Sequence, residues 1–147
     1  MNAEFEFDRK SWSDMLDKLN KKIKEPQKDP VFQGIVTIAS FKDIVQHFED
    51  ENGPNGNWKE RSQPYKSWIE AQGKTKILQV SGILRGSITP GKGKFKTNSS
   101  GILLYSKVPY AQKHDEGLEG MPKRSFMWLS SKAIKNIVAQ VSRWLAE

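Results

Sequence analysis

Two histidines and the carboxylates beside them are the side chains in this 147-residue sequence best suited to chemistry. His47 stands four residues before Glu51, and His114 is followed directly by Asp115 and Glu116. A zinc site needs three or four converging ligands, and neither histidine has the rest of such a set nearby in the sequence. The chain has no cysteine, which excludes disulfides, thiolate catalysis and cysteine-based zinc sites. We therefore expect structural or surface roles for both histidines and no bound metal.

No other pattern in the sequence is typical of catalysis. The 17 carboxylates mostly alternate with lysines on predicted helix faces, so no pair stands in an apolar setting that would separate two pKa values. The G-x-S-x-G motif of serine hydrolases is absent. The run Gly91-Lys92-Gly93-Lys94 lacks the spacing of a phosphate-binding loop and stands where a hairpin turn is expected. We expect no enzymatic activity and no cofactor.

Basic residues are concentrated in the middle of the chain. Residues 61–114 carry ten basic side chains and one acidic side chain, a net charge of +9, whereas residues 31–60 carry two and five, a net charge of −3. Such a basic region can face nucleic acid or an acidic protein surface. The candidate basic patch consists of Arg85, Lys92, Lys94, Lys96, Lys107 and Lys113.

Length and hydropathy favour one domain, 1–147. The mean hydropathy of −0.68 indicates a small core for this length. No apolar run approaches the roughly 18 residues of a membrane helix, and the acidic, aromatic start MNAEFEFD is not typical of a signal peptide. We expect no contact with a membrane.

Apolar residues at helical spacing predict helices over residues 9–25, about 30–51 and about 130–146. Ser11 or Ser13 is expected to cap the first helix, Pro26 to end it, and Ser130 or Ser131 to cap the last. The Pro-containing turn between the first two helices suggests a helical hairpin, so residues 1–51 form a helical part. Residues 52–75 are predicted to be an extended loop with a short helix at 64–72, because turn residues interrupt all periodicity there.

A period of two replaces the helical period in the β-rich part, residues 76–129. We expect strands at 83–89, 94–97 and 102–106, joined by turns at 90–93 and 98–101, with 126–128 as a further candidate. Residues 77–80 are read as a short strand or a helix end. The fold class is therefore α+β: a small antiparallel sheet of about 3–5 strands within residues 77–129, packed against an N-terminal helical hairpin and a long C-terminal helix, residues 130–147.

One stretch, residues 101–129, has an unusual order of turn residues and aromatics. After the predicted strand, Pro109 suits the start of a short helix that places Tyr110 and His114 on one face, and Gly117 ends it. The stretch contains V-P-Y-A-x-x-H-[DE]-x-G followed by M-P-x-R-x-F-x-x-L. The positions that carry this pattern are Val108, Pro109, Tyr110, Ala111, His114, Glu116, Gly117, Pro122, Arg124, Phe126 and Leu129.

This pattern resembles the C-terminal signature of the virion morphogenesis, or tail-completion, proteins of tailed phages. The signature usually has proline directly after the arginine, where this chain has Ser125. Two further family-like runs precede it in the expected order, so the resemblance covers about residues 40–145. They are formed by Phe48, Glu51, Gly53, Pro54, Gly56 and Trp58, and by Ile77, Leu78, Gly82, Leu84, Ser87 and Ile88.

The resemblance implies a structural protein that completes the tail or joins head to tail as a homo-oligomer, expected to be a ring, at the tail end or neck. It implies other phage tail or neck proteins as partners, and a place in the virion or, during assembly, in the host bacterial cytoplasm. The His114, Glu116 and Gly117 positions would fix the turn and the approach of neighbouring subunits. The candidate interface consists of Trp58, Trp68, Tyr110, His114, Glu116, Arg124, Phe126 and Trp128.

A second interpretation is a basic nucleic-acid-binding module. It would use residues 61–114 together with Trp58, Trp68, Tyr65 and Phe95, because loop aromatics beside basic residues can stack on bases. Packing of the loop aromatics onto the chain's own core is the alternative to both interpretations. The two functions also overlap, since DNA passes through a neck ring and non-specific DNA contact is compatible with either.

Overall fold

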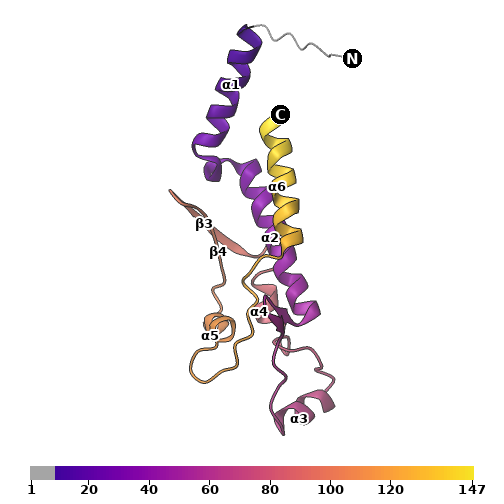
Figure 1. Cartoon of the computed structure of the whole chain (residues 1–147). Coiled ribbons are helices and arrows are strands. Elements are labelled where there is room, and N and C mark those ends of the chain that lie inside the picture. Colours follow the sequence, from indigo (N-terminus) through magenta and orange to yellow (C-terminus); the bar gives the residue numbers. More distant parts are fainter. Residues whose placement is uncertain (1–8) are drawn as a thin grey trace, which may run out of the picture.

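The computed structural model describes residues 9–147, with the side chains of residues 9, 11, 12 and 15 left aside. The acidic start of the chain, and the contributions of Trp12 and Met15 to the apolar stripe of the first helix, therefore lie outside the described residues. Figure 1 shows the arrangement of the chain, with α1 at one end of the molecule and α3 and α5 at the other.

The two N-terminal helices are confirmed, with α1 at Arg9–Lys24 and α2 at Pro30–Asp50. Between them, η1 is a short 3-10 helix, Pro26–Lys28, and Pro26 ends α1 as predicted. Asp29 caps α2, because its carboxylate accepts hydrogen bonds from the backbone N–H groups of Val31 (2.8 Å) and Phe32 (3.2 Å). Ser11 and Ser13 lie inside α1, so neither is its cap.

The first two helices do not fold back on each other as a close hairpin. They run in the same general direction along the molecule (Figure 1). The link between the two helices, η1, is bonded to the end of β3. Gln27 of η1 is buried, and its Nε2 donates to the carbonyl of Asn98 at 3.0 Å. α1 instead contacts the C-terminal helix, where the Lys22 ammonium lies over the ring of Trp144 at 5.2 Å.

The C-terminal helix, α6, spans Ser131–Ala146 and packs along α2 (Figure 1). Ser130 caps it as predicted, since its Oγ accepts from the N–H of Ala133 at 3.2 Å. The same hydroxyl donates to the carboxylate of Asp43 at 2.7 Å, and the Ser130 N–H does so at 2.8 Å. The start of α6 is therefore tied to the middle of α2.

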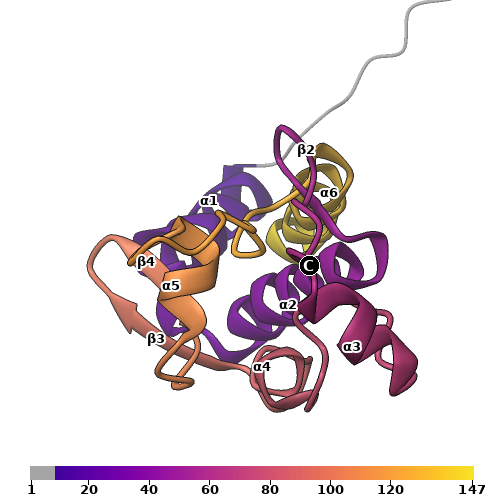
Figure 2. The same cartoon turned by 90° about the horizontal axis from the view of Figure 1, so that it is seen from below.

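The α+β class is confirmed, but the sheets of the described residues are smaller than predicted. β1 (Asn52–Gly53) pairs with β2 (Gly56–Asn57), and β3 (Lys94–Asn98) pairs with β4 (Gly101–Tyr105), both antiparallel. The register of the second pair runs from Lys94 opposite Tyr105 to Asn98 opposite Gly101. Viewed along α2, this pair and α6 lie on different sides of that helix (Figure 2). Residues 126–128 form no strand.

The predicted strand at 83–89 is wrong, because this segment contains the short helix α4, Ile83–Gly86. Gly82 has a φ of 75°, which turns the chain into the helix. Leu84 and Ile88, four residues apart, are both buried and face the same core. Residues four positions apart lie on one face both in a helix and in a strand, so the spacing of these two side chains does not distinguish the two structures. The predicted turn at 90–93 therefore connects a helix, not a strand, to β3.

The remaining short helices agree with the predictions. α3 spans Tyr65–Ala71 within the long loop, and α5 spans Ala111–Glu116, with Gly117 at its C-terminal end in the left-handed conformation. Gly93 is needed for a close approach, because a Cβ there would come within 2.5 Å of the ring of Phe41.

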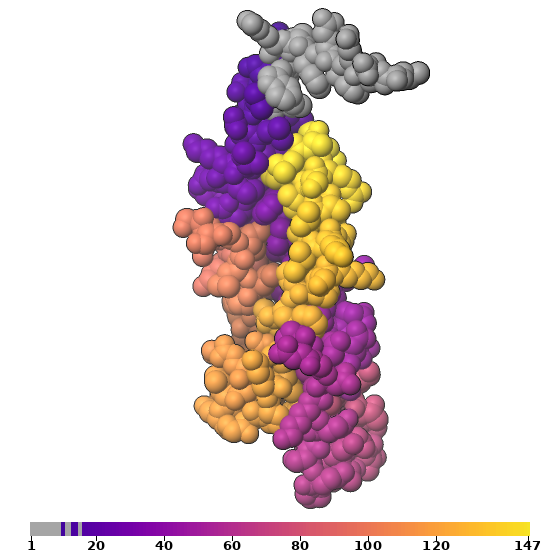
Figure 3. Space-filling model, viewed as in Figure 1, coloured from indigo at the N-terminus to yellow at the C-terminus, as the bar shows by residue number. Residues whose placement is uncertain are grey.

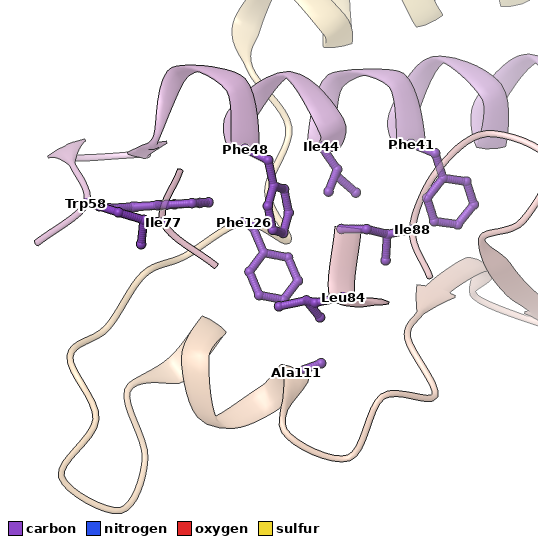
Figure 4. Packing of buried hydrophobic residues seen from close by; sticks show 9 residues of the cluster. All are labelled: Phe41, Ile44, Phe48, Trp58, Ile77, Leu84, Ile88, Ala111 and Phe126. Carbon is purple, nitrogen blue, oxygen red and sulfur yellow. The ribbon is translucent and has the colours of Figure 1, made fainter. Parts of the chain in front are cut away.

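The core gathers side chains from α2, from the loop after β2, from residues 77–88, from α5 and from the segment after α5. Figure 4 shows α2 facing α4, α5 and the loops across this cluster. Phe48 is fully buried, with its ring 5.3 Å from that of Trp58 and 5.2 Å from that of Phe126. The members are Phe41, Ile44, Phe48, Trp58, Ile77, Leu84, Ile88, Ala111 and Phe126. Each of the three family-like runs contributes to this core.

Candidate functional site

The segment that follows α5 is held by the last residues of that helix. The Asp115 carboxylate accepts from the backbone N–H groups of Phe126 and Met127, both at 2.9 Å. The Arg124 N–H donates to the carbonyl of His114 at 2.8 Å. Gly117 has a φ of 70°, and a Cβ there would meet the backbone of Lys123 at 2.9 Å. We call residues 114–128 the clasp, because the chain leaves α5 and returns to bond to it.

Arg124 joins the clasp to the loop after β2. Its side chain is buried, and its guanidinium donates to the carbonyls of Lys59 (2.8 Å) and Glu60 (3.1 Å). The indole N–H of Trp58 bonds back to the carbonyl of Ser125 at 2.9 Å. Two segments separated by more than sixty residues are thus fastened by charged and neutral hydrogen bonds.

Ser125, the departure from the family-like pattern, contributes to the clasp. Its hydroxyl donates to the carbonyl of Asp115 at 3.0 Å, a bond that proline at this position could not make. Its carbonyl accepts from the indoles of Trp58 and Trp128. The ring of Trp128 stacks on His47 with a centroid separation of 3.8 Å, which attaches the end of the clasp to α2.

Removing the Asp115 carboxylate should loosen the clasp. Asp115→Ala leaves two backbone N–H groups without their acceptor, and we expect the free energy of unfolding to fall by about 1.5–3 kcal/mol. Asp115→Asn keeps one acceptor oxygen and should lose less. Urea denaturation measures both. Glu116→Ala, at the exposed neighbouring position, is the control and should change the value by less than about 0.5 kcal/mol.

The structure divides the candidate interface residues into two groups. Trp58, Arg124 and Phe126 are buried, so they stabilise this chain and are not available to another subunit in this conformation. For Trp58 the alternative of packing onto the chain's own core is therefore the one observed. His114 and Trp128 are partly buried, and Glu116, Tyr110 and Trp68 are exposed, with Trp68 at 60%.

His47 and His114 have different surroundings. His47 is buried, and its Nε2 lies 2.9 Å from the carbonyl of Trp128 and 3.4 Å from Asp43, whereas Glu51 bonds to the N–H of Ile77. Among the described residues, no group of three or more metal-ligating side chains converges. No helix within residues 9–147 is long and apolar enough to cross a membrane.

A pocket of about 220 Å³ lies where α3, the 77–84 segment and α5 meet the clasp. Arg61, Tyr65, Val80, Tyr110, His114 and Arg124 are among its lining residues. Arg61 is held by hydrogen bonds to the carbonyls of Lys74, at 2.8 Å, and Lys76. The sequence predicts Tyr65 only as a base-stacking aromatic, and no pattern in it singles out Arg61 as a site residue. Their proximity to Arg124 depends on the path of the 58–65 loop, which no local signal predicts.

The pocket disfavours positive charge. Burial lowers the pKa of His114, and Arg124 lowers it further by repulsion. Burial also lowers the pKa of Arg124, and Arg61 adds to this effect, while Glu60 opposes it. His114 Nδ1 is buried without a hydrogen-bond partner among the described residues. The pocket therefore holds two guanidinium groups and a histidine that favours its neutral form.

The lowered pKa of His114 should make stability depend on pH. Because the unfolded chain binds this proton more readily, with a pKa of about 6.5, acid favours unfolding. The contribution is fully present above about pH 6.5 and is lost as the pH falls toward the lower folded-state pKa. The urea midpoint should rise between pH 5 and 7, and His114→Gln should flatten the rise. An equal slope in the variant would contradict this assignment, and NMR titration of the ring gives an independent check.

The candidate basic patch contains two cations that form ion pairs and four exposed lysines. Arg85 pairs with Glu49, and Lys113 lies 2.7 Å from Glu119, so these two cations are already neutralised in part. Lys92, Lys94 and Lys96 are exposed in and beside β3, and Lys107 is exposed just after β4. Within the described chain, no ion pair involves these four lysines, although Lys96 lies over the ring of Tyr105 at 5.7 Å.

Several aliphatic side chains remain exposed on the helical half of the molecule. α6 turns Ala133 and Trp144 toward α2, while Ile134 and Val138, one helical turn apart, remain 48% and 58% exposed. α1 and α2 leave further aliphatic side chains exposed, at Leu16, Ile23, Val31 and Ile38. Figure 3 shows α6 along one face of the molecule beside α1. A groove lined by Leu19, Ser142 and Leu145 runs between these two helices.

Comparison with known proteins gives a phage relative. The chain is similar to Mu-like prophage FluMu G protein 1 of Haemophilus influenzae, with 29% identity over 108 residues that cover 72% of each chain. No protein-family model matches the sequence. No solved structure matches it either. The similarity supports a phage or prophage origin for this chain.

Proposed function

We propose that this chain is a structural assembly protein of a tailed phage or prophage. It acts without catalysis in tail completion or head–tail joining, by oligomerising into a ring at the tail end or neck. Its partners are further copies of itself and other tail or neck proteins, in the virion and in the host cytoplasm during assembly. The similarity to a prophage protein and the tail-completion pattern within residues 40–145 support this proposal.

The observation that carries the proposal is the exposure of aliphatic side chains on α1, α2 and α6. Ile134 and Val138 on the apolar stripe of α6 remain exposed, whereas Ile137, Val141 and Leu145 of the same stripe are partly buried. Complete burial of an aliphatic side chain contributes about 1.5–3 kcal/mol relative to exposure, so covering several of them favours association. Exposed apolar surface of this kind is typical of protein contacts. A catalytic or small-molecule function would leave it unexplained.

The test is the solution mass across a concentration series, measured by light scattering with negative-stain images of any large species. The wild-type chain should grow into a closed ring, and Ile134→Asp/Val138→Asp should shift assembly to at least tenfold higher concentration. Asn136→Asp/Ala139→Asp adds the same two charges at exposed positions of α6 and should assemble like the wild type. A wild-type chain that stays monomeric throughout contradicts ring formation by this chain alone.

A second function, non-specific nucleic-acid binding, is favoured by one observation. Lys92, Lys94 and Lys96 are exposed together at β3, and Phe95 between them is partly accessible. Lys92→Glu/Lys94→Glu/Lys96→Glu should weaken binding of duplex DNA and reduce its salt dependence if these lysines contact phosphates, while assembly continues. If the same variant abolishes assembly, the lysines serve subunit contacts.

A further inference from the structure

The pocket beside the clasp has the chemistry of an anion site. Its lining includes the guanidinium groups of Arg61 and Arg124 and contains no carboxylate. Burial lowers the pKa of Arg124, and the positive charge of Arg61 lowers it further. An anion in the pocket would relieve this repulsion and would favour the charged forms of Arg124 and His114.

The surroundings of the pocket are aromatic and apolar. Tyr65 is 45% exposed and lies beside Trp68, with a ring separation of 6.0 Å. Tyr110 and Val80 are also exposed at the lining. A small ion would leave these side chains in water. The site therefore suits a segment that carries carboxylates and aromatic rings together, because rings gain from contact with other rings and with guanidinium groups.

The first eight residues of this chain, MNAEFEFD, have that composition. Glu4, Glu6 and Asp8 alternate with Phe5 and Phe7, and the segment contains no Lys, Arg or His. Residues 31–60 carry more acidic side chains but lie within the folded chain, where Glu49 and Glu60 already pair with basic side chains. The N-terminal segment is thus complementary to the pocket in both charge and aromatic content.

A chain cannot place this segment in its own pocket. The pocket is lined by residues of α3, α5 and the clasp. α3 and α5 lie at the opposite end of the molecule from α1, which the segment joins, and α2 runs between the two ends (Figure 1). The 21 residues of α2 span about 32 Å, and eight extended residues reach at most about 29 Å. Any such contact must therefore be made between two copies.

We propose that this pocket binds the acidic, aromatic segment 4–8 of a second copy of the chain. The inference rests on the proposed assembly function and names the contact that would link its subunits. The contact joins one end of a copy to the opposite end of the next, so it is heterologous. Repetition of such a contact gives a ring when the rotation closes.

The first experiment measures binding of a fluorescent peptide with the sequence of residues 1–8 to the full chain by anisotropy. The peptide should bind the wild type, and Arg61→Glu should weaken binding at least tenfold. A peptide with Glu4→Lys and Glu6→Lys should bind at least tenfold more weakly to the wild type. Tyr65→Ala, at an exposed position, should also weaken binding of the peptide without changing the melting temperature. This variant tests the pocket if Arg61→Glu fails to fold.

Three results would overturn the inference. They are no peptide binding at millimolar concentration, equal affinity for wild type and both pocket variants, and tighter binding of a single-stranded oligonucleotide that is lost in Arg61→Glu. The last result would assign the pocket to nucleic acid.

The second experiment mixes two full-length variants. One carries Glu4→Lys/Glu6→Lys/Asp8→Lys and the other Arg61→Glu, so each lacks one half of the contact. Each alone should be monomeric, whereas an equimolar mixture should give a dimer, because one intact pair remains. If both variants still form rings alone, the inference fails while the assembly function stands. If the peptide binds the pocket but the wild type forms no ring, the proposed contact is supported and the proposed ring assembly is contradicted.

Discussion

Phe126→Ala is expected to lower the free energy of unfolding by about 3–5 kcal/mol, the largest effect of any substitution considered for this chain. The Phe126 side chain is 1% exposed and packs at 5.2 Å from the ring of Phe48. Its truncation removes the transfer free energy of the ring and leaves a cavity among side chains from four separate segments. The sequence pattern placed Phe126 at a candidate subunit contact, and the structure places it in the core.

Urea denaturation at a protein concentration below assembly measures this effect. Trp68→Ala is the matched control, because Trp68 is also an aromatic candidate for the interface but is 60% exposed. It should change the monomer's stability by less than about 0.5 kcal/mol while affecting contacts with other molecules. A Phe126→Ala chain as stable as wild type, with a defect only in assembly, would contradict the core placement.

Arg124→Ala should lower the free energy of unfolding by about 2–3 kcal/mol. The guanidinium is buried and donates to two backbone carbonyls, those of Lys59 and Glu60. Its loss leaves both carbonyls without this donor and detaches the clasp from the loop after β2. Arg124→Lys should be intermediate, since one ammonium cannot reproduce the fork of donors.

The neighbouring exposed cation provides the control for this prediction. Lys123→Ala removes the same charge without a buried hydrogen bond and should be neutral within about 0.5 kcal/mol. Hydrogen exchange should locate the effect of Arg124→Ala in residues 114–128 and in the Trp58 region. If Arg124 served only a subunit contact, the isolated chain would unfold at the same urea concentration as wild type.

The clasp gives the family-like pattern a physical meaning. Gly117 is required by its φ of 70° and by the close approach of Lys123, and Arg124 is required by the carbonyls it joins. Phe126 and Ala111 are required by the core. Most of the pattern therefore maintains the fold, and the exposed positions, Tyr110 above all, remain available for recognition.

The sequence by itself determined the elements whose signals act over a few residues. Helical periodicity and Pro26 predicted α1 and α2, the Ser130 cap predicted α6, and Pro109 with Gly117 predicted α5. The β3–β4 hairpin followed from its turn and its alternation. Each of these signals depends on the chain's own backbone bonds and neighbouring side chains, which are the same in any tertiary context.

Only the tertiary structure decided which aromatics are buried and where the cations meet. Trp58 and Trp68 stand in similar polar surroundings in the sequence, yet the indole of Trp58 is buried and donates to the carbonyl of Ser125, whereas Trp68 is exposed. Leu84 and Ile88 fit a strand or a helix until the core selects one face. The pocket joins Arg61 to Arg124 across more than sixty residues. Such long-range contacts depend on how the elements pack together, and no local pattern encodes them.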